Sequence, residues 1–191
     1  MSNGKPLFLF VGKSASGKTT IANILEDKYG LKSVASYTTR PPRHEGEREH
    51  VFLSESEFDE LGELAAYTIY NGYRYGVTFD QVEECDIYVI DPPGVKYLLD
   101  KINIDRPISI IYFNAAVSTR IDRMMDRGAS DLEIIKRLHH DDTIEDWYHT
   151  LNSIAYAYNY IYLPDSGIDL HVVNANENIE NVLKQVLFYM K

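Results

Sequence analysis

A glycine-rich segment near the N-terminus has the residue types and spacing that hold a chain of phosphates. Residues 12–19 read Gly-Lys-Ser-Ala-Ser-Gly-Lys-Thr and match the pattern G-x-x-x-x-G-K-[ST] at every fixed position. Glycines let the backbone curl so that successive N–H groups converge on phosphate oxygens, and the helix that follows directs its positive end there. Lys18 supplies a charge to the β- and γ-phosphates, and the Thr19 hydroxyl is a ligand for Mg²⁺. The segment predicts that ATP and Mg²⁺ are cofactors, with the nucleotide held by Ser14, Ala15, Ser16, Gly17, Lys18, Thr19 and Thr20.

A second candidate group is a pair of arginines separated by two prolines. Proline pushes the preceding Arg40 into an extended conformation, and consecutive prolines favour a polyproline turn of three residues. Arg40 and Arg43 lie three positions apart, so both guanidiniums are expected to project to the same side. Such a pair suits a dianionic phosphate group, although a solvated Arg-Pro loop is an equally good interpretation of these residues alone.

A carboxylate, Asp91, ends the apolar run 87–90. Ligands of open parallel sheets bind at the carboxyl ends of the strands. Asp91 is therefore predicted to hold the Mg²⁺ shell through water, and a role as helix N-cap before the two prolines that follow is compatible with this.

The elements that must position these groups alternate along the chain. Continuous apolar runs, typical of strands buried on both faces, are each followed by a helical pattern. This alternation predicts an α/β fold with three αβα layers and a parallel sheet. The expected strands are 7–11, 87–90, 108–113 and 170–173, and the expected helices are 19–29, 95–102, 117–127 and 179–189.

Two segments interrupt the alternation. Residues 36–86 are rich in Pro, Gly, Arg and Tyr and are expected to form short strands and turns, whereas residues 116–160 are expected to be almost wholly helical. We interpret both as lobes that close over ligands within one domain, 1–191. The core is then 1–35, 87–115 and 164–191, with an acceptor-binding lobe at 36–86 and a helical lid region at 116–160.

Composition excludes several classes of function. The formal net charge of −10 argues against a nucleic acid polymer as a partner, because such proteins need a basic surface. No apolar run reaches the length of a membrane span. A single cysteine, Cys85, and an N-terminus without a cleavage pattern favour a cytoplasmic location.

The sequence resembles the guanylate kinase family over nearly its whole length. The motifs that carry the resemblance are the phosphate loop, Ser36–Arg43, Gly46-Glu47 with Phe52, Gly72–Gly76, Asp91 with Gly94, and Arg123, Arg127-Gly128 and Arg137-Leu138. The resemblance implies a P-loop kinase fold in which Ser36, Arg40, Arg43 and Tyr75 hold the phosphate of a nucleoside monophosphate. It also implies that lid arginines at 123, 127 and 137 act with Lys18 on the ATP phosphates, and that Asn174 lies beside the adenine.

Four positions depart from the family pattern. Ala66 stands where the family reads the guanine edge with a glutamate, and Val89 replaces one of two acids near Asp91. His50 replaces a phosphate-binding tyrosine, and the hydroxyl expected after Gly76 is available only one position later, on Thr78. His50 and Thr78 are nevertheless expected to contact the acceptor. Side chains that could read the base instead are Glu63, Tyr67, Thr68, Tyr70 and Tyr73.

Two helical patterns in the lid region have competing interpretations. Arg120, Arg123 and Arg127 share one helical stripe, which either an anionic ligand or the neighbouring acids Asp122 and Asp126 would neutralise. Residues 139–142, His-His-Asp-Asp, are interpreted as a solvated helix face, because adjacent helical residues point about a hundred degrees apart and do not converge on one metal ion.

The sequence therefore predicts MgATP-dependent phosphoryl transfer to a nucleoside monophosphate, with GMP or dGMP as the first candidate, in a monomer or homodimer. The alternative is a kinase for a different nucleotide or a sugar phosphate, favoured by Ala66 and Val89. A binding module or a P-loop ATPase explains less, because the phosphate loop is intact and the arginine pair sits in its own lobe.

Overall fold

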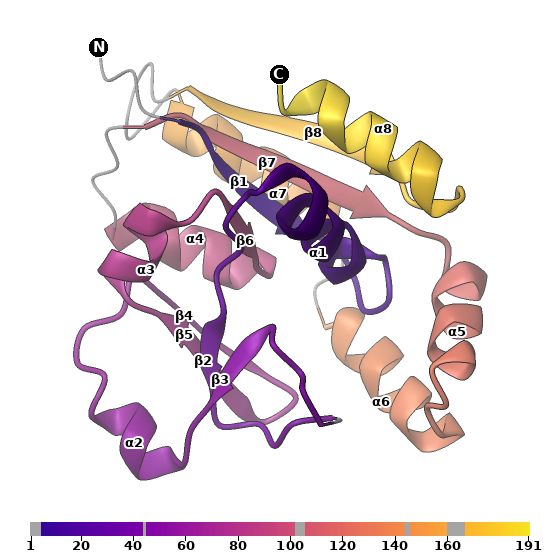
Figure 1. The fold of residues 1–191 in the computed structure, drawn as a ribbon, viewed down its shortest axis with the longest axis horizontal. Coiled ribbons are helices and arrows are strands. Elements are labelled where there is room, and N and C mark those ends of the chain that lie inside the picture. Colours follow the sequence, from indigo (N-terminus) through magenta and orange to yellow (C-terminus); the bar gives the residue numbers. More distant parts are fainter. Residues whose placement is uncertain (1–4, 44, 102–105, 144–145, 160–166) are drawn as a thin grey trace.

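The computed structural model describes residues 5–43, 45–101, 106–143, 146–159 and 167–191 (Figure 1). Its centre is a sheet of four parallel strands in the order β6-β1-β7-β8. The strands are β1 (Leu7–Val11), β6 (Ile87–Val89), β7 (Ile108–Asn114) and β8 (Ile168–Asn174). All five residues of β1 are buried, as the continuous apolar run predicts for a strand inside a parallel sheet.

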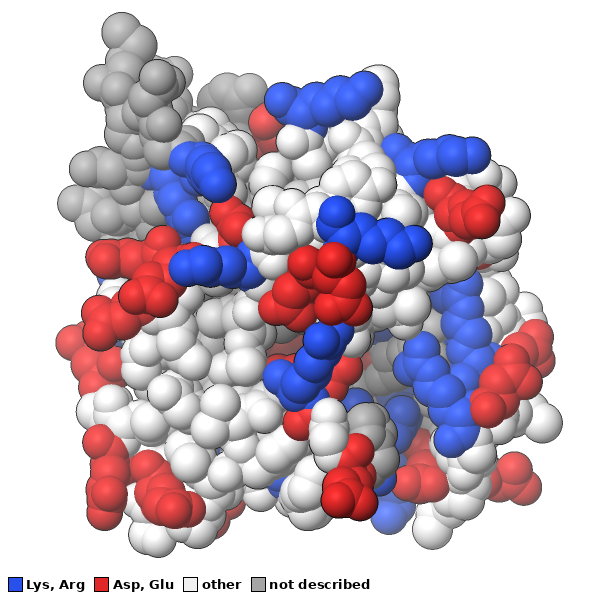
Figure 2. Space-filling model, in the orientation of Figure 1, with Lys and Arg blue, Asp and Glu red and all other residues white. Residues whose placement is uncertain are grey.

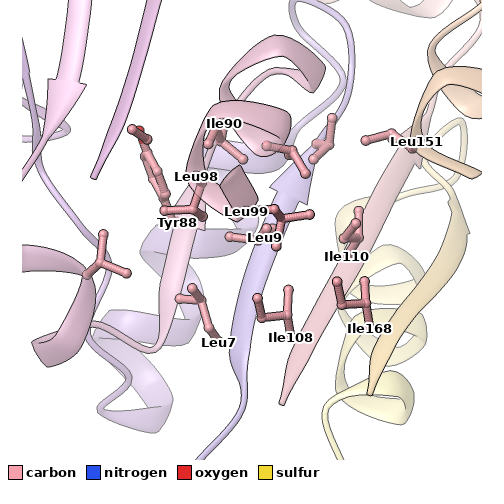
Figure 3. Packing of buried hydrophobic residues seen from close by; sticks show 14 of the residues in the cluster. Leu7, Leu9, Tyr88, Ile90, Leu98, Leu99, Ile108, Ile110, Leu151 and Ile168 are labelled. Carbon is pink, nitrogen blue, oxygen red and sulfur yellow. The ribbon is translucent and has the colours of Figure 1, made fainter. Parts of the chain in front are cut away.

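Helices cover both faces of this sheet. Helices α1 (Lys18–Tyr29) and α8 (Ile179–Tyr189) enclose one hydrophobic cluster with inward-facing residues such as Phe10 and Phe113. Helices α4 (Pro92–Lys101) and α7 (Trp147–Ala157) enclose the other, part of which Figure 3 shows between β1, β7 and these helices. The predicted three-layer αβα fold is confirmed.

A second sheet is formed within residues 36–77, in the order β3-β2-β5-β4. Its strands are β2 (Ser36–Thr38), β3 (His50–Phe52), β4 (Ala66–Tyr70) and β5 (Tyr73–Val77), with α2 (Glu55–Asp59) before β4 and α3 (Phe79–Glu84) after β5. The β4–β5 hairpin turns through Asn71 and Gly72, both at positive φ (51° and 79°), which is the favoured geometry for a two-residue hairpin loop. This hairpin packs on α4 and so faces the central sheet (Figure 1).

The segment expected to be helical contains three helices with two kinds of packing. Helices α5 (Val117–Asp126) and α6 (Asp131–Asp141) follow the carboxyl end of β7 and lie away from the other two helical layers in Figure 1. In contrast, α7 contributes Trp147, Leu151 and Ala155 to the core. Within the described part of residues 116–160, α5 and α6 thus lie apart from the core helix α7, and we call these two the lid helices.

The start of α4 differs from the sequence expectation for a local reason. The apolar periodicity begins at Val95, but the helix begins three residues earlier, at Pro92. Proline is well suited to the first helical position because its missing N–H is not needed there. No described helix is long and apolar enough to cross a membrane.

Gly12 is a point where the fold and the phosphate loop constrain each other. A Cβ atom at this position would lie 2.7 Å from Ser16 Oγ and 2.8 Å from the Phe113 carbonyl oxygen of β7. We expect Gly12→Ala to lower the free energy of unfolding by about 1–3 kcal/mol, the usual cost of overpacking. Gly46→Ala is the control, because no atom lies within 4 Å of its Cβ position and only its positive φ opposes the change. Urea denaturation checks this, and equal unfolding midpoints for Gly12→Ala and wild type would contradict it.

Candidate functional site

A cavity of about 210 Å³ opens between the phosphate loop, the second sheet and the lid helices. Its wall combines cationic, hydroxyl and aromatic side chains from segments far apart in the sequence. The lining includes Ser14, Ala15, Gly17, Lys18, Thr19, Thr20, Ser36, Arg43, His50, Thr68, Tyr70, Tyr75, Tyr88, Val89, Asp91, Arg127, Arg137 and Asp141. Most of the positions predicted to contact a nucleotide or its acceptor are therefore brought together.

The phosphate loop adopts the curled conformation that its glycines predict. Gly17 has φ 100°, and even Ala15 is held at φ 60°. Lys18 Nζ donates hydrogen bonds to the carbonyl oxygens of Gly12 (2.5 Å) and Lys13 (3.1 Å). Burial lowers the pKa of Lys18 to about 8, an effect that the nearby Asp141 carboxylate partly opposes. A phosphate placed in the loop would favour the charged ammonium, so the loop has the chemistry of an anion site.

The guanidiniums of Arg40 and Arg43 lie on the same side, as their spacing predicts, because both reach Glu47: Arg43 Nη1 is 3.9 Å from Glu47 Oε1, and Arg40 is closer. Arg43 lines the cavity, whereas Arg40 is buried, forms an ion pair with Glu47 (Nη2 to Oε1, 2.5 Å) and donates from Nε to the Tyr75 hydroxyl (3.1 Å). Glu47 also accepts a hydrogen bond from the Arg43 amide at 2.7 Å. The buried Glu47 neutralises the charge of Arg40. Arg40 therefore supports the segment that presents Arg43 and Tyr75.

His50, expected on the acceptor side, lies in the cavity and contacts a second predicted residue. Its Nδ1 is 2.8 Å from Ser36 Oγ, and its ring packs against Tyr75 with centroids 5.4 Å apart. Burial, together with the charge of Arg40, lowers the pKa of His50 to about 4. The imidazole is therefore neutral at pH 7 and forms one hydrogen bond with Ser36 without adding a charge to the cavity.

Asp91 is the N-cap of α4 and also faces the cavity. One carboxylate oxygen accepts a hydrogen bond from the Gly94 amide (2.8 Å) and the other from the Thr68 hydroxyl (2.9 Å). Burial raises the pKa of Asp91, and these two hydrogen bonds oppose the rise. With Thr19, Asp91 offers the small oxygen donor set that suits Mg²⁺, an ion that keeps several waters and binds substrate phosphates.

The positions that depart from the family pattern lie in different environments. Ala66 is fully buried in the core, while Thr68, on the same face of β4, takes its place in the cavity wall. Val89 lines the cavity beside Tyr88. Thr78 does not line it: its hydroxyl accepts a hydrogen bond from the Gln81 amide and caps α3. The strand ends at Val77, so Thr78 is the N-cap of α3, and its predicted contact with the acceptor stays a prediction.

The lid arginines divide into three roles. Arg127 and Arg137 line the cavity. Arg123 lies behind the phosphate loop, where it donates to the carbonyl oxygens of Ser16 (3.1 Å) and Ala175 (2.7 Å). Arg120 is fully buried and forms an ion pair with Asp141 at 2.7 Å. Neither Asp122 nor Asp126 neutralises this stripe, and only one of its three arginines faces the cavity.

Asp141 is the cavity residue that sequence reasoning missed. The interpretation of residues 139–142 as a solvated helix face holds for His139 and Asp142, which are exposed. It is wrong for Asp141, which is 0% exposed, and for His140, which packs against the ring of Tyr70. The signal was present in α6: Ile134, Leu138 and Asp141 recur at helical spacing, so Asp141 continues an apolar stripe. A carboxylate at such a position requires buried partners.

Several charges on the outer surface form ion pairs. In Figure 2 basic side chains lie next to acidic ones over the face shown. Arg48 pairs with Asp27 at 3.1 Å, and Arg74 pairs with Asp59 at 2.6 Å. In the cavity, by contrast, burial and the neighbouring Arg40 and Arg137 lower the pKa of Arg43. An overall acidic protein therefore carries a local cluster of cations suited to a phosphorylated small molecule.

Comparison with known proteins agrees with the motifs. No family model matches the sequence. A guanylate kinase from Neisseria meningitidis serogroup A is 30% identical over 144 residues, which cover 69% of this chain and 69% of that relative. A guanylate kinase from Neisseria gonorrhoeae is 29% identical over the same share of each chain. The chain belongs to the guanylate kinase family.

Solved structures extend the likeness of this guanylate kinase family member at the level of the fold. A sugar kinase from Janibacter sp. HTCC2649 superposes with a TM-score of 0.51 at 14% identity, over 98% of this chain and 95% of that one. A gluconokinase from Sinorhizobium meliloti 1021 gives a TM-score of 0.50 at 11% identity, over 97% and 91%. At these identities the likeness shows the kinase fold alone.

Asn174, like Arg40, Arg123 and Thr78, is not among the residues that line the described cavity. Asn174 ends β8, is exposed, and donates from its side chain to Glu177 at 3.3 Å. Its predicted position beside the adenine of ATP stays a prediction.

The lowered pKa of His50 generates a pH dependence of stability. The unfolded chain binds a proton at His50 near the ordinary pKa of 6.5, and the folded chain only near 4. Stability from this group is therefore complete above pH 6.5 and is lost as the pH falls towards 4. We expect His50→Gln to lose less stability than wild type between pH 7 and pH 4.5, measured by urea midpoints. Parallel losses in the two proteins would show that His50 is not held neutral by the fold.

Proposed function

We propose that the protein transfers the γ-phosphoryl group of MgATP to a nucleoside monophosphate. The observation that carries this proposal is that Lys18 of the phosphate loop and Arg43 of the second sheet's segment line one cavity, together with Arg127 and Arg137. A site for ATP alone needs no second cationic wall. Membership of the guanylate kinase family supports the same reaction.

The donor side is assigned to the phosphate loop and the lid. Backbone N–H groups of residues 15–20 and the Lys18 ammonium would hold the triphosphate, and Thr19 with Asp91 would hold Mg²⁺. When bound, the ion neutralises charge on the β- and γ-phosphates. Arg127 and Arg137 would stabilise the charge that develops on the transferred group, which is the main electrostatic requirement of phosphoryl transfer.

The acceptor side is assigned to the wall that faces the loop. Arg43, Ser36, His50 and Tyr75 would hold the acceptor phosphate, since they combine one guanidinium with neutral hydrogen-bonding groups. Arg40 keeps Tyr75 and Glu47 in place. No covalent nucleophile is required, because an acceptor phosphate oxygen is already ionised and attacks once it is positioned in line.

The base of the acceptor would lie against Thr68, Tyr70, Tyr88 and Val89. Two carboxylates that the family pattern places here are replaced by the buried Ala66 and by Val89, so Asp91 and Thr68 are left to hydrogen-bond the base. GMP or dGMP is the first candidate. A different nucleotide or a sugar phosphate is the second, because an unmatched polar group on a buried base costs about 1–3 kcal/mol.

An acceptor panel tests the proposal directly. Purified protein is incubated with MgATP and each nucleoside monophosphate, with sugar phosphates as a second set, and ADP release is followed. We expect turnover with at least one nucleoside monophosphate and a loss of about a hundredfold or more in Lys18→Ala, which removes the charge on the transferring phosphate. ATP binding without turnover of any nucleotide would refute the proposal, and turnover of a sugar phosphate alone would establish the second candidate.

Thr68 generates a separate prediction about the base. Thr68→Val keeps the shape of the side chain but removes the hydroxyl that donates to Asp91. If the Thr68–Asp91 pair reads the base, kcat/KM for the preferred acceptor falls about tenfold to a hundredfold. KM for MgATP changes less, because Asp91 keeps its hydrogen bond from the Gly94 amide. Thr150→Val is the matched control, because the hydrogen bond described for its hydroxyl is local, to the carbonyl of Asp146 at the N-cap of α7. An unchanged acceptor kcat/KM in Thr68→Val would exclude Thr68 from base recognition.

A further inference from the structure

Asp141 gathers hydrogen bonds from several separate parts of the molecule. Its Oδ2 accepts from the Ser14 amide (2.9 Å) and from Arg120 Nη1 (2.7 Å). Its Oδ1 lies 3.1 Å from the Ser14 hydroxyl and 3.2 Å from the Tyr70 hydroxyl, which are 2.6 Å from each other, so these three oxygens share two protons. In addition, Trp147 Nε1 donates to the Asp141 carbonyl oxygen at 2.9 Å.

These partners belong to the parts that would surround the two substrates. Ser14 is in the phosphate loop, Tyr70 is at the tip of the β4–β5 hairpin, and Arg120 is on α5. Asp141 itself is the last residue of α6. One buried carboxylate therefore links the donor loop, the acceptor wall and both lid helices.

Stability alone does not explain the Arg120–Asp141 pair. The side chains are 2% and 0% exposed, so both charges have lost their hydration. Replacing a buried ion pair by apolar residues is often neutral or stabilising. Moreover, Arg120 Nε has no hydrogen-bond partner among the described residues. The arrangement is electrostatically costly, and what it adds is a fixed carboxylate at the phosphate loop.

We propose that Asp141 is a positioning residue that fastens α6 to the phosphate loop and thereby holds Arg137 over the cavity. Arg137 lies four residues earlier, which places it one turn away on the same side of α6. A helix anchored at Ser14 and Tyr70 presents this arginine before a ligand arrives. Less conformational entropy is then lost when the ligand binds, and the charge of Arg137 already lies where the phosphoryl group would be transferred.

The neighbouring contact provides an internal comparison. Asp142 pairs with Lys13 at 3.1 Å, but its side chain is 68% exposed. Exposed ion pairs contribute little, because water and salt screen them. The anchor is therefore assigned to Asp141 and not to Asp142.

The proposal rests on the proposed function only in requiring that the protein binds ATP and transfers its phosphoryl group. The test compares wild type, Arg120→Met/Asp141→Ala, Arg137→Ala and the combination of all three changes. The double variant removes both buried charges, so no unpaired Arg120 is left behind. Unfolding midpoints, MgATP affinity by calorimetry, and kcat and KM on the best acceptor are measured for each, with Asp142→Asn as the control.

We expect the double variant to unfold close to the wild-type midpoint while its kcat falls about tenfold or more, since small misplacements of a catalytic group have effects of this size. Adding Arg137→Ala should then cost less than twofold, because Asp141 acts through Arg137. Asp142→Asn should match wild type. Wild-type kcat in the double variant, or a full additional loss on removing Arg137, would overturn the proposal.

Two outcomes separate this proposal from the function on which it rests. Wild-type protein that fails to bind MgATP refutes the proposed function, whereas binding and turnover with additive losses refute only the role of Asp141. If the double variant does not fold, Asp141→Asn keeps the side-chain shape, and the same cycle with Arg137→Ala applies. Non-additive losses in that cycle support the anchor, and additive losses overturn it.

Discussion

Parallel pairing of β1 with β6 and β7 is the constraint on which the rest of the arrangement depends. The register sets Phe10 against Val89 and Ile111, so the three strands end at the same edge of the sheet. The phosphate loop leaves β1 at this edge, and Asp91 follows β6 there. Hydrophobic clusters on both faces keep the strands in register. A loop that must hold phosphates and a carboxylate suited to a metal are thus neighbours as a consequence of backbone hydrogen bonding.

Arginines in this protein serve two purposes, and burial separates them. Arg40 and Arg120 are 7% and 1% exposed, and each is matched with a buried carboxylate, Glu47 or Asp141. Each pair fixes the shape of a segment that faces the cavity. Arg43, Arg127 and Arg137 line the cavity itself and are the cations assigned to ligands in the proposed reaction. The Arg40–Glu47 pair holds the loop between β2 and β3, and the Arg120–Asp141 pair joins α5 to α6, while the cavity arginines provide charge.

The acceptor wall combines a strongly polar part with a weakly polar part. Around Ser36 and His50 the side chains suit a phosphate, whereas Tyr70, Tyr88 and Val89 form a surface suited to a flat ring. Two carboxylates border this surface: Thr68 donates to one oxygen of Asp91, and the Tyr70 hydroxyl contacts Asp141. This polarity gradient matches a phosphorylated ligand with one apolar face.

Local sequence signals were sufficient for the phosphate loop, the central strands and the family. The loop follows from glycine conformational freedom and a fixed spacing, and the strands follow from continuous apolar runs, both of which depend only on neighbours in the chain. The orientation of Arg40 was decided by tertiary structure, since its partner Tyr75 is 35 positions away. The same holds for Asp141, whose bonds to Ser14 and Arg120 span 127 and 21 positions. A helical spacing shows which residues share a face, but only packing decides whether that face meets water or a buried partner.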